Sequence, residues 1–274
     1  MAEPYFFTIP LTLAFLYFTW YSFWGWVIET AYCSIREKHF VVRGFLAGPL
    51  CPIYGAGALI MVLFFQPLSA YPLLLYPVAC VVMTSWEYLV GWALEAITHI
   101  KYWDYSDRKW NLHGRVCLSI GLCWGAVAYV AIYWIHPATE SLFSLLVPPA
   151  RWYAAIFLAL ITIADTVTTI RKLALTTKFF AMAELTWNEL QQKRQDLRKS
   201  GRQAADTARL QAALAAMEIR HSNLVRAAAY HSRRFRSRFR NISTGRYKDT
   251  LVRIREQASH IREGLKIHSK KGGK

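Results

Sequence analysis

Four carboxylates lie within stretches of the sequence that are otherwise apolar enough to cross a membrane. Glu29 and Asp165 lie near one end of their stretches, whereas Glu87 and Glu95 share a third stretch. Their separation of eight residues places Glu87 and Glu95 on one helical face, roughly two turns apart. An ionisable group inside a bilayer is energetically costly, so each of these residues needs a partner or a function.

Glu87 is the strongest functional candidate, because it lies deepest in its stretch and has no cationic residue near it in the sequence. A deep carboxylate can bind a cation or carry a proton. It can also be protonated and hydrogen-bonded to a neighbouring Tyr or Trp. The sequence leaves these alternatives open.

Two arginines begin the apolar stretches that follow, on the same side of the membrane as most of the carboxylates. Arg43 begins the second stretch and Arg115 begins the fourth. One interpretation is a polar vestibule that opens to the cytoplasm. The other is a set of salt bridges between helices, with Arg43–Glu29 and Arg115–Glu95 as the natural pairs.

The elements that position these charges are about five apolar stretches, each near the 20 residues that a membrane-spanning helix needs. They cover residues 11–31, 44–65, 71–97, 116–135 and 152–170. Soluble helices carry a polar stripe, which these stretches largely lack. The sequence therefore predicts an all-α fold, a polytopic membrane bundle of about five helices.

Charge divides the chain into two predicted domains. Residues 1–170 contain 8 Lys and Arg against 9 Asp and Glu, whereas residues 171–274 contain 25 against 8. We expect a transmembrane domain over 1–170 and a basic, helical, cytoplasmic tail over 171–274. Cations in short loops favour the cytoplasmic side, which predicts an outside N-terminus and a cytoplasmic C-terminus. The loop cations of this chain lie in the first and third loops, at Arg36, Lys38, Arg43, Lys101, Arg108, Lys109 and Arg115.

Glycine and proline crowd the start of the second stretch, where they interrupt regular helix. These residues are Gly44, Gly48, Pro49, Pro52, Gly55 and Gly57. A broken or re-entrant backbone, as in many transport sites, is one interpretation. Close helix packing through small residues is the other.

Four motifs in order carry a family resemblance. They are residues 23–30 (FWGWVIET), 43–55 (RGFLAGPLCPIYG), 87–95 (EYLVGWALE) and 103–106 (WDYS), the last followed by Asn111 and Gly114-Arg115. Over about residues 15–137 the chain resembles the bacterial CmpB-type family of ABC-transporter type IV permeases. The resemblance implies a multi-pass protein of the bacterial inner membrane. The chain has no phosphate-binding Walker A motif, so the resemblance also implies a separate nucleotide-binding subunit.

The family motifs also carry over onto particular residues. These are Glu29, Arg43, Glu87, Glu95, Asp104, Asn111 and Arg115. We take them as the candidates for a substrate or ion vestibule. The loop at residues 102–106 would lie across it as a lid or would anchor the chain at the membrane interface.

The tail contains three amphipathic segments with narrow apolar stripes at steps of three and four, which is typical of coiled-coil packing. The first includes Phe180, Trp187 and Leu190, the second includes Leu214 and His221, and the third covers residues 247–265. Five arginines between the last two segments are candidates for binding anionic lipid, at Arg233, Arg234, Arg236, Arg238 and Arg240. Nucleic acid is the less favoured partner, because the tail is tethered to a membrane.

These observations leave three functions. The first is a transport-associated membrane subunit of unknown substrate, acting as an oligomer if five helices are too few for a pathway. The second is a membrane enzyme acting on a lipid or phosphorylated substrate through Glu29, Glu95, Asp104 and Arg115. The third is a tethered scaffold that recruits a partner through its tail. We expect no catalytic motif, cofactor or metal site, and the five cysteines are interpreted as small apolar fillers.

The predicted orientation can be tested by labelling single cysteines in a cysteine-free background. Cysteines at residues 36–43, at 104–112 and in the tail are expected to resist an impermeant thiol reagent in intact cells. A cysteine at 66–70 is the accessible control. Labelling of the first group from outside would contradict the orientation.

Overall fold

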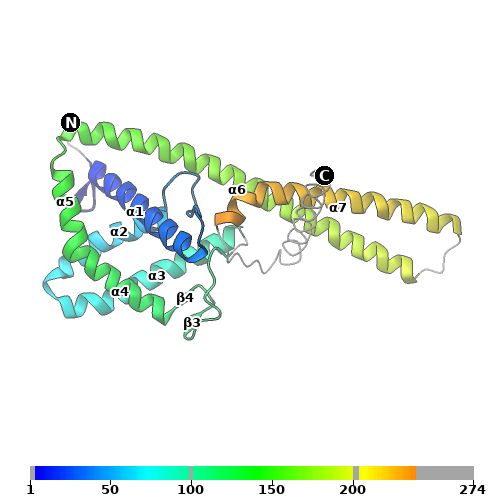
Figure 1. The fold of residues 1–274 in the computed structure, drawn as a ribbon, viewed down its shortest axis with the longest axis horizontal. Helices are drawn as coiled ribbons and strands as arrows, with labels where there is room; N and C mark the ends of the chain where they lie inside the picture. The colour runs from blue at the N-terminus through cyan, green and yellow to red at the C-terminus, as the bar shows by residue number, and fades with distance from the viewer. Residues whose placement is uncertain (1–3, 99–100, 200–203, 239–274) are drawn as a thin grey trace, which may run out of the picture. The chain divides into compact units, whose positions relative to one another are not determined.

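The computed structural model describes residues 4–98, 101–199 and 204–238, and it confirms the predicted all-α fold (Figure 1). The helices are α1 (Leu11–Glu37), α2 (Pro52–Phe65), α3 (Pro72–Thr98), α4 (Leu118–Val130), α5 (His136–Ser144), α6 (Pro148–Lys199) and α7 (Ala204–Arg238). A 3-10 turn, η1 (Pro67–Ala70), joins α2 to α3, and a π-helical segment, η2 (Ala131–Ile135), joins α4 to α5. Two short antiparallel hairpins complete the fold. They pair β1 (Tyr5–Phe6) with β2 (Ile9–Pro10) and β3 (Asn111–Leu112) with β4 (Val116–Cys117).

In the part of the chain that the structure describes, four helices are long and apolar enough to cross a membrane. They are Leu11–Glu37, Pro72–Thr98, Leu118–Ser144 and Pro148–Asp196. The third joins α4, η2 and α5 into one continuous span. The protein is therefore a multi-pass membrane protein.

The second predicted stretch differs from expectation. Helix α2 has 14 residues, and at 1.5 Å per residue it is too short to cross the roughly 30 Å apolar layer alone. Residues 44–51 before it are not helical. Gly44 has φ +98°, a conformation outside the helical region, and Pro52 occupies the first turn of α2, where its missing N–H is tolerated.

Small residues bring α1 and α2 close together, so both interpretations of the glycine run hold in part. Gly55 lies against the Phe18 carbonyl and the Ser22 hydroxyl, and Gly25 lies against the ring of Tyr54. A Cβ at either glycine would collide with these neighbours. Helix α2 then continues into a buried apolar cluster with α3, α4 and η2, formed by Met61, Phe65, Leu75, Ala79, Met83, Ala128 and Ile132.

The chain divides into two compact units, one made mainly of residues 1–170 and the other mainly of residues 171–236. In the second unit, α6 and α7 run side by side in opposite directions (Figure 1), with the rings of Trp187 and His221 5.3 Å apart. Arg194 forms an ion pair with Glu218. The third tail segment, 247–265, lies outside the described residues.

Candidate functional site

Asp165 of α6 holds the non-helical segment 44–51. Its Oδ1 accepts a hydrogen bond from the Ala47 N–H at 2.9 Å, and its Oδ2 accepts one from the Gly48 N–H at 2.7 Å. The Thr169 hydroxyl also accepts from Ala47, at 3.1 Å. Backbone groups in an apolar layer have no water to bond, so this carboxylate satisfies donors that have no helical partner in the non-helical segment.

The carboxylate of Asp165 also explains why position 48 is a glycine. A Cβ at Gly48 would lie 3.0 Å from Asp165 Oδ2, which is tighter than most real contacts. The segment is anchored at its other end by α1, because the Cys51 N–H donates to the Ser22 carbonyl at 2.9 Å. Asp165 was predicted to lie within a membrane-spanning stretch, but no partner for it was predicted from the sequence.

Arg43 and Glu29 each contact a cysteine. Arg43 Nε donates to Cys33 Sγ at 2.9 Å, and Cys51 Sγ donates to Glu29 Oε2 at 3.5 Å. The charge of Arg43 also acts on the Glu29 carboxylate. The interpretation of the cysteines as apolar fillers is wrong for Cys33 and Cys51, which are buried and contact polar groups.

Arg115 and Glu95 form the expected ion pair. Glu95 Oε2 lies 2.9 Å from Arg115 Nε and 2.8 Å from Nη2. The guanidinium also donates to the Tyr88 hydroxyl at 3.3 Å and lies 5.4 Å from the centre of that ring. This pair links α3 to the segment that enters α4.

The loop between α3 and α4 is shaped by its own polar side chains. Asp104 Oδ1 accepts from the backbone N–H and the hydroxyl of Ser106, at 3.0 and 2.6 Å. Asn111 donates to the carbonyls of Ser106 and Arg108 and accepts from the Gly114 N–H. Asp104 and Asn111 thus hold the loop conformation.

Glu87 receives two hydrogen bonds and is 6% exposed. The Tyr105 hydroxyl donates to Oε1 at 3.1 Å, and Trp124 Nε1 donates to Oε2 at 2.9 Å. Burial, together with the nearby Glu87 carboxylate, raises the pKa of Tyr105 well above its usual range. The phenol therefore keeps its proton and remains a donor to Glu87.

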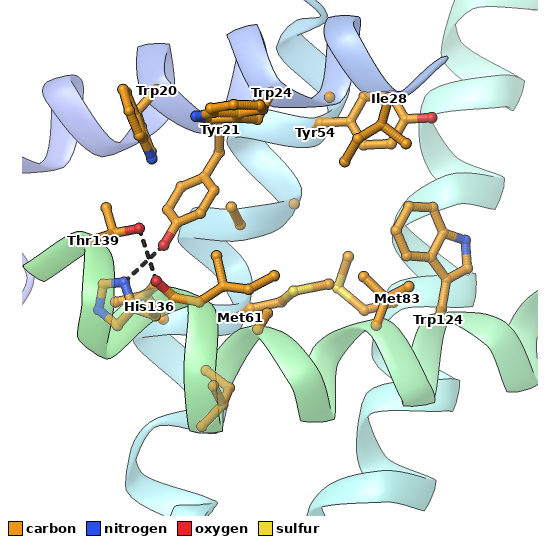
Figure 2. Close-up of a pocket in the computed structure, with 18 of the residues that line it drawn as sticks. Trp20, Tyr21, Trp24, Ile28, Tyr54, Met61, Met83, Trp124, His136 and Thr139 are labelled. Carbon is orange, nitrogen blue, oxygen red and sulfur yellow. Dashed lines mark hydrogen bonds between the residues drawn. The ribbon is translucent and has the colours of Figure 1, made fainter. Parts of the chain in front are cut away.

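A cavity of about 630 Å³ lies within the first unit (Figure 2). Residues of α1, α2, α3 and the α4–η2–α5 helix line it. Aromatic side chains make up much of its wall: Trp20, Tyr21, Trp24, Tyr54, Trp86, Trp124 and Trp134. Figure 2 shows Tyr21 reaching across the space to His136, and their Oη and Nδ1 atoms are 3.1 Å apart.

The predicted vestibule residues do not converge on this space. Of the described residues that line the cavity, Glu87 alone carries a carboxylate. The other six candidates are absent from that lining: Glu29, Arg43, Glu95, Asp104, Asn111 and Arg115. No group of three or more His, Cys, Asp or Glu in the described part of the chain could hold a metal ion.

The cavity was not predicted from the sequence. The spacing of Trp20 and Trp24 by one helical turn was a signal that α1 carries an aromatic face, but lipid and a cavity both accept such a face. The five arginines that are candidates for binding anionic lipid stay a prediction from the sequence. Arg240 lies outside the described residues, and the side chains of Arg233, Arg234, Arg236 and Arg238 are not among those described.

The fold and these contacts define a polytopic helical membrane protein whose short second helix follows a non-helical segment held by Asp165. A family model described as "Putative ABC-transporter type IV" matches residues 16–170, more than half of the chain. The chain belongs to this family. The match covers the non-helical segment 44–51 and Asp165, and it ends before the tail. No curated protein and no solved structure matches the chain.

Replacing Asp165 with Asn is expected to loosen the segment 44–51. One carboxylate oxygen becomes an NH₂ group that faces a backbone donor, which removes a hydrogen bond worth about 1.5–3 kcal/mol. Hydrogen exchange should accelerate at Ala47 and Gly48, and thermal stability in detergent should fall. Thr168→Ala, on the exposed side of α6, is the control. Unchanged exchange in Asp165→Asn would contradict the assignment.

A double-mutant cycle tests the pair of Arg115 and Glu95. The side chains are 17% and 28% exposed, so solvent screens them in part, and we expect a coupling energy of about 0.5–3 kcal/mol. The measurement is thermal or denaturant unfolding of Arg115→Ala, Glu95→Ala and the double variant. Arg108→Ala, an exposed loop cation, should be additive with Glu95→Ala. Additivity in the first cycle would refute the coupling.

Two substitutions at Glu87 separate the need for its charge from the need for its oxygens. In Glu87→Gln the amide oxygen can accept from Trp124 while the NH₂ group donates to Tyr105, so folding should be nearly unchanged. In Glu87→Leu both donors lose their partner, at about 1–3 kcal/mol each. Yield and unfolding temperature should fall only in Glu87→Leu. Equal losses in both variants would show that the carboxylate charge itself stabilises the fold.

Proposed function

We propose that the protein is the membrane subunit of a transport system and works with a separate nucleotide-binding subunit. The observation that carries this proposal is the non-helical segment 44–51 at the start of the second apolar stretch, whose backbone donors at Ala47 and Gly48 are bound by Asp165. Non-helical backbone that is supported by neighbouring groups inside the membrane is characteristic of transport proteins, where it borders a pathway. Family membership over the same residues supports the proposal.

The enzyme alternative has less support from the geometry. Two of its four proposed residues, Arg115 and Glu95, are ion-paired with each other, and Asp104 accepts from Ser106 within its own loop. Glu29 contacts Cys51. A substrate-binding site of this kind would need these groups to face a common space.

The proposal includes an orientation and a membrane. We place the N-terminus outside and the C-terminus in the cytoplasm of a bacterial cell, with the protein in the inner membrane. Cations in the loops after α1 and α3 support this orientation. The arginines from Arg233 to Arg240 would then lie on the side where anionic lipids attract cations. Self-association would complete a pathway that a single bundle is too small to form.

The test is to purify the tagged full-length protein from membranes after mild crosslinking and to quantify its partners by mass spectrometry. A protein with a Walker A motif should be enriched in constant ratio, and the complex should hydrolyse ATP. An enriched partner set without any nucleotide-binding protein would count against transport. Loss of the partner on removing residues 204–274, with the membrane unit still folded, would favour the scaffold.

A further inference from the structure

The cavity in the first unit has the size of a ligand site. Its volume of about 630 Å³ falls within the roughly 300–1,000 Å³ of small-molecule pockets. Its wall combines indole rings with aliphatic and thioether groups, such as Val62, Met61 and Met83. An occupant must therefore be largely apolar.

Several polar groups in the wall already bond to other protein groups. Glu87 accepts from Tyr105 and Trp124, and Tyr21 shares a hydrogen bond with His136. Thr139 Oγ1 donates to the Ile135 carbonyl at 2.8 Å. A charged or strongly polar ligand would have to break these bonds, whereas a hydrocarbon chain leaves them intact.

The cavity opens toward the membrane between α1 and the α4–η2–α5 helix. Ile28 on α1 and Trp134 on η2 both line it, yet they are 65% and 61% exposed. These helices are membrane spans, so lipid covers their exposed side chains. Figure 2 shows the side chains of the two helices facing each other across the space.

The far wall is closed. Met61 on α2 and Met83 on α3 line the cavity and are 5% and 1% exposed. Lipid packed around the bundle cannot reach these two side chains unless a chain enters the cavity. A mouth on the bilayer side and a closed apolar floor together describe a site that is filled from the membrane.

We propose that this cavity binds one acyl chain of a bilayer lipid, which enters between α1 and η2–α5. The proposal goes beyond the transport role and does not depend on a partner subunit. The bilayer supplies the ligand at high local concentration, and the apolar wall gives water few groups to bond.

Photolabelling of the full-length protein tests this site. The protein is reconstituted in phosphatidylethanolamine vesicles containing a phosphatidylglycerol with a diazirine midway along one acyl chain. After irradiation, mass spectrometry should find lipid adducts at Met61 and Met83. Adducts at Leu73 and Val81, which are 93% and 67% exposed on α3, report the surrounding lipid. Adducts confined to such exposed positions would overturn the proposal.

Two variants fill the space from different walls. Ala58→Phe on α2 and Ala131→Phe on η2 place a ring in the cavity, since both alanines line it. Each should reduce labelling of Met61 and Met83 several-fold while Leu73 and Val81 label as before. The matched control is Ala126→Phe, at an exposed position of α4 that is not in the lining. It should label like the parent protein.

The remaining outcomes are also decisive. Undiminished labelling in both filled variants, when they elute and unfold like the parent, would overturn the site. If neither variant folds, labelling of Met61 and Met83 in the parent decides alone. Labelling by a diazirine fatty acid but not by the phospholipid would replace the bilayer lipid with a free amphiphile and overturn the assignment. Because no partner takes part, failure here would leave the transport proposal standing.

Discussion

Within a bilayer, every backbone N–H and C=O needs a partner inside the protein, and this requirement organises the first unit. Residues 44–51 leave the helical path, so their donors must be satisfied elsewhere. Asp165 supplies two acceptors to Ala47 and Gly48 from a helix more than a hundred residues away. Because Asp165 holds the connection between α1 and α2, the two helices can approach each other closely at Gly25 and Gly55.

The ionisable residues of the bundle follow the same principle. Each described candidate has a specific contact: Arg115 with Glu95, Glu87 with Tyr105 and Trp124, and Asp104 with Ser106. The pair of Arg115 and Glu95 joins α3 to the segment that enters α4, and the contacts of Glu87 join α3 to the loop at Tyr105 and to α4 at Trp124. Glu87 is part of the wall of the apolar cavity, and the other six vestibule candidates, all in the described part of the chain, are not in that wall.

The sequence predicted what depends on length and local pattern. Apolar stretches of sufficient length indicated the helices. The ion pair of Glu95 and Arg115 was predicted because a carboxylate in a membrane span requires a partner and Arg115 lies at the same end of the bundle. The contact of Asp165 with Ala47 and Gly48 depends on tertiary approach and involves backbone atoms, which carry no residue-type signal. Trp134 lines the cavity, and its residue type does not predict this place, because an aromatic residue suits a cavity and a membrane interface equally well. The five residues of η2 have no composition that distinguishes them from α-helix.

The π-helical segment η2 has a consequence for how α4 and α5 are aligned. Such a segment accommodates one more residue than a regular turn, and one residue corresponds to about 100° of rotation. Helix α5 is therefore out of phase with α4, and this offset directs His136 toward Tyr21 and brings Phe143 against Tyr17 and Trp20. With the segment regularised, the same side chains would point along a different azimuth. Comparison of sequences across Ala131–Ile135 must therefore allow a one-residue shift in phase, because helical periodicity counted from α4 assigns the wrong faces to α5.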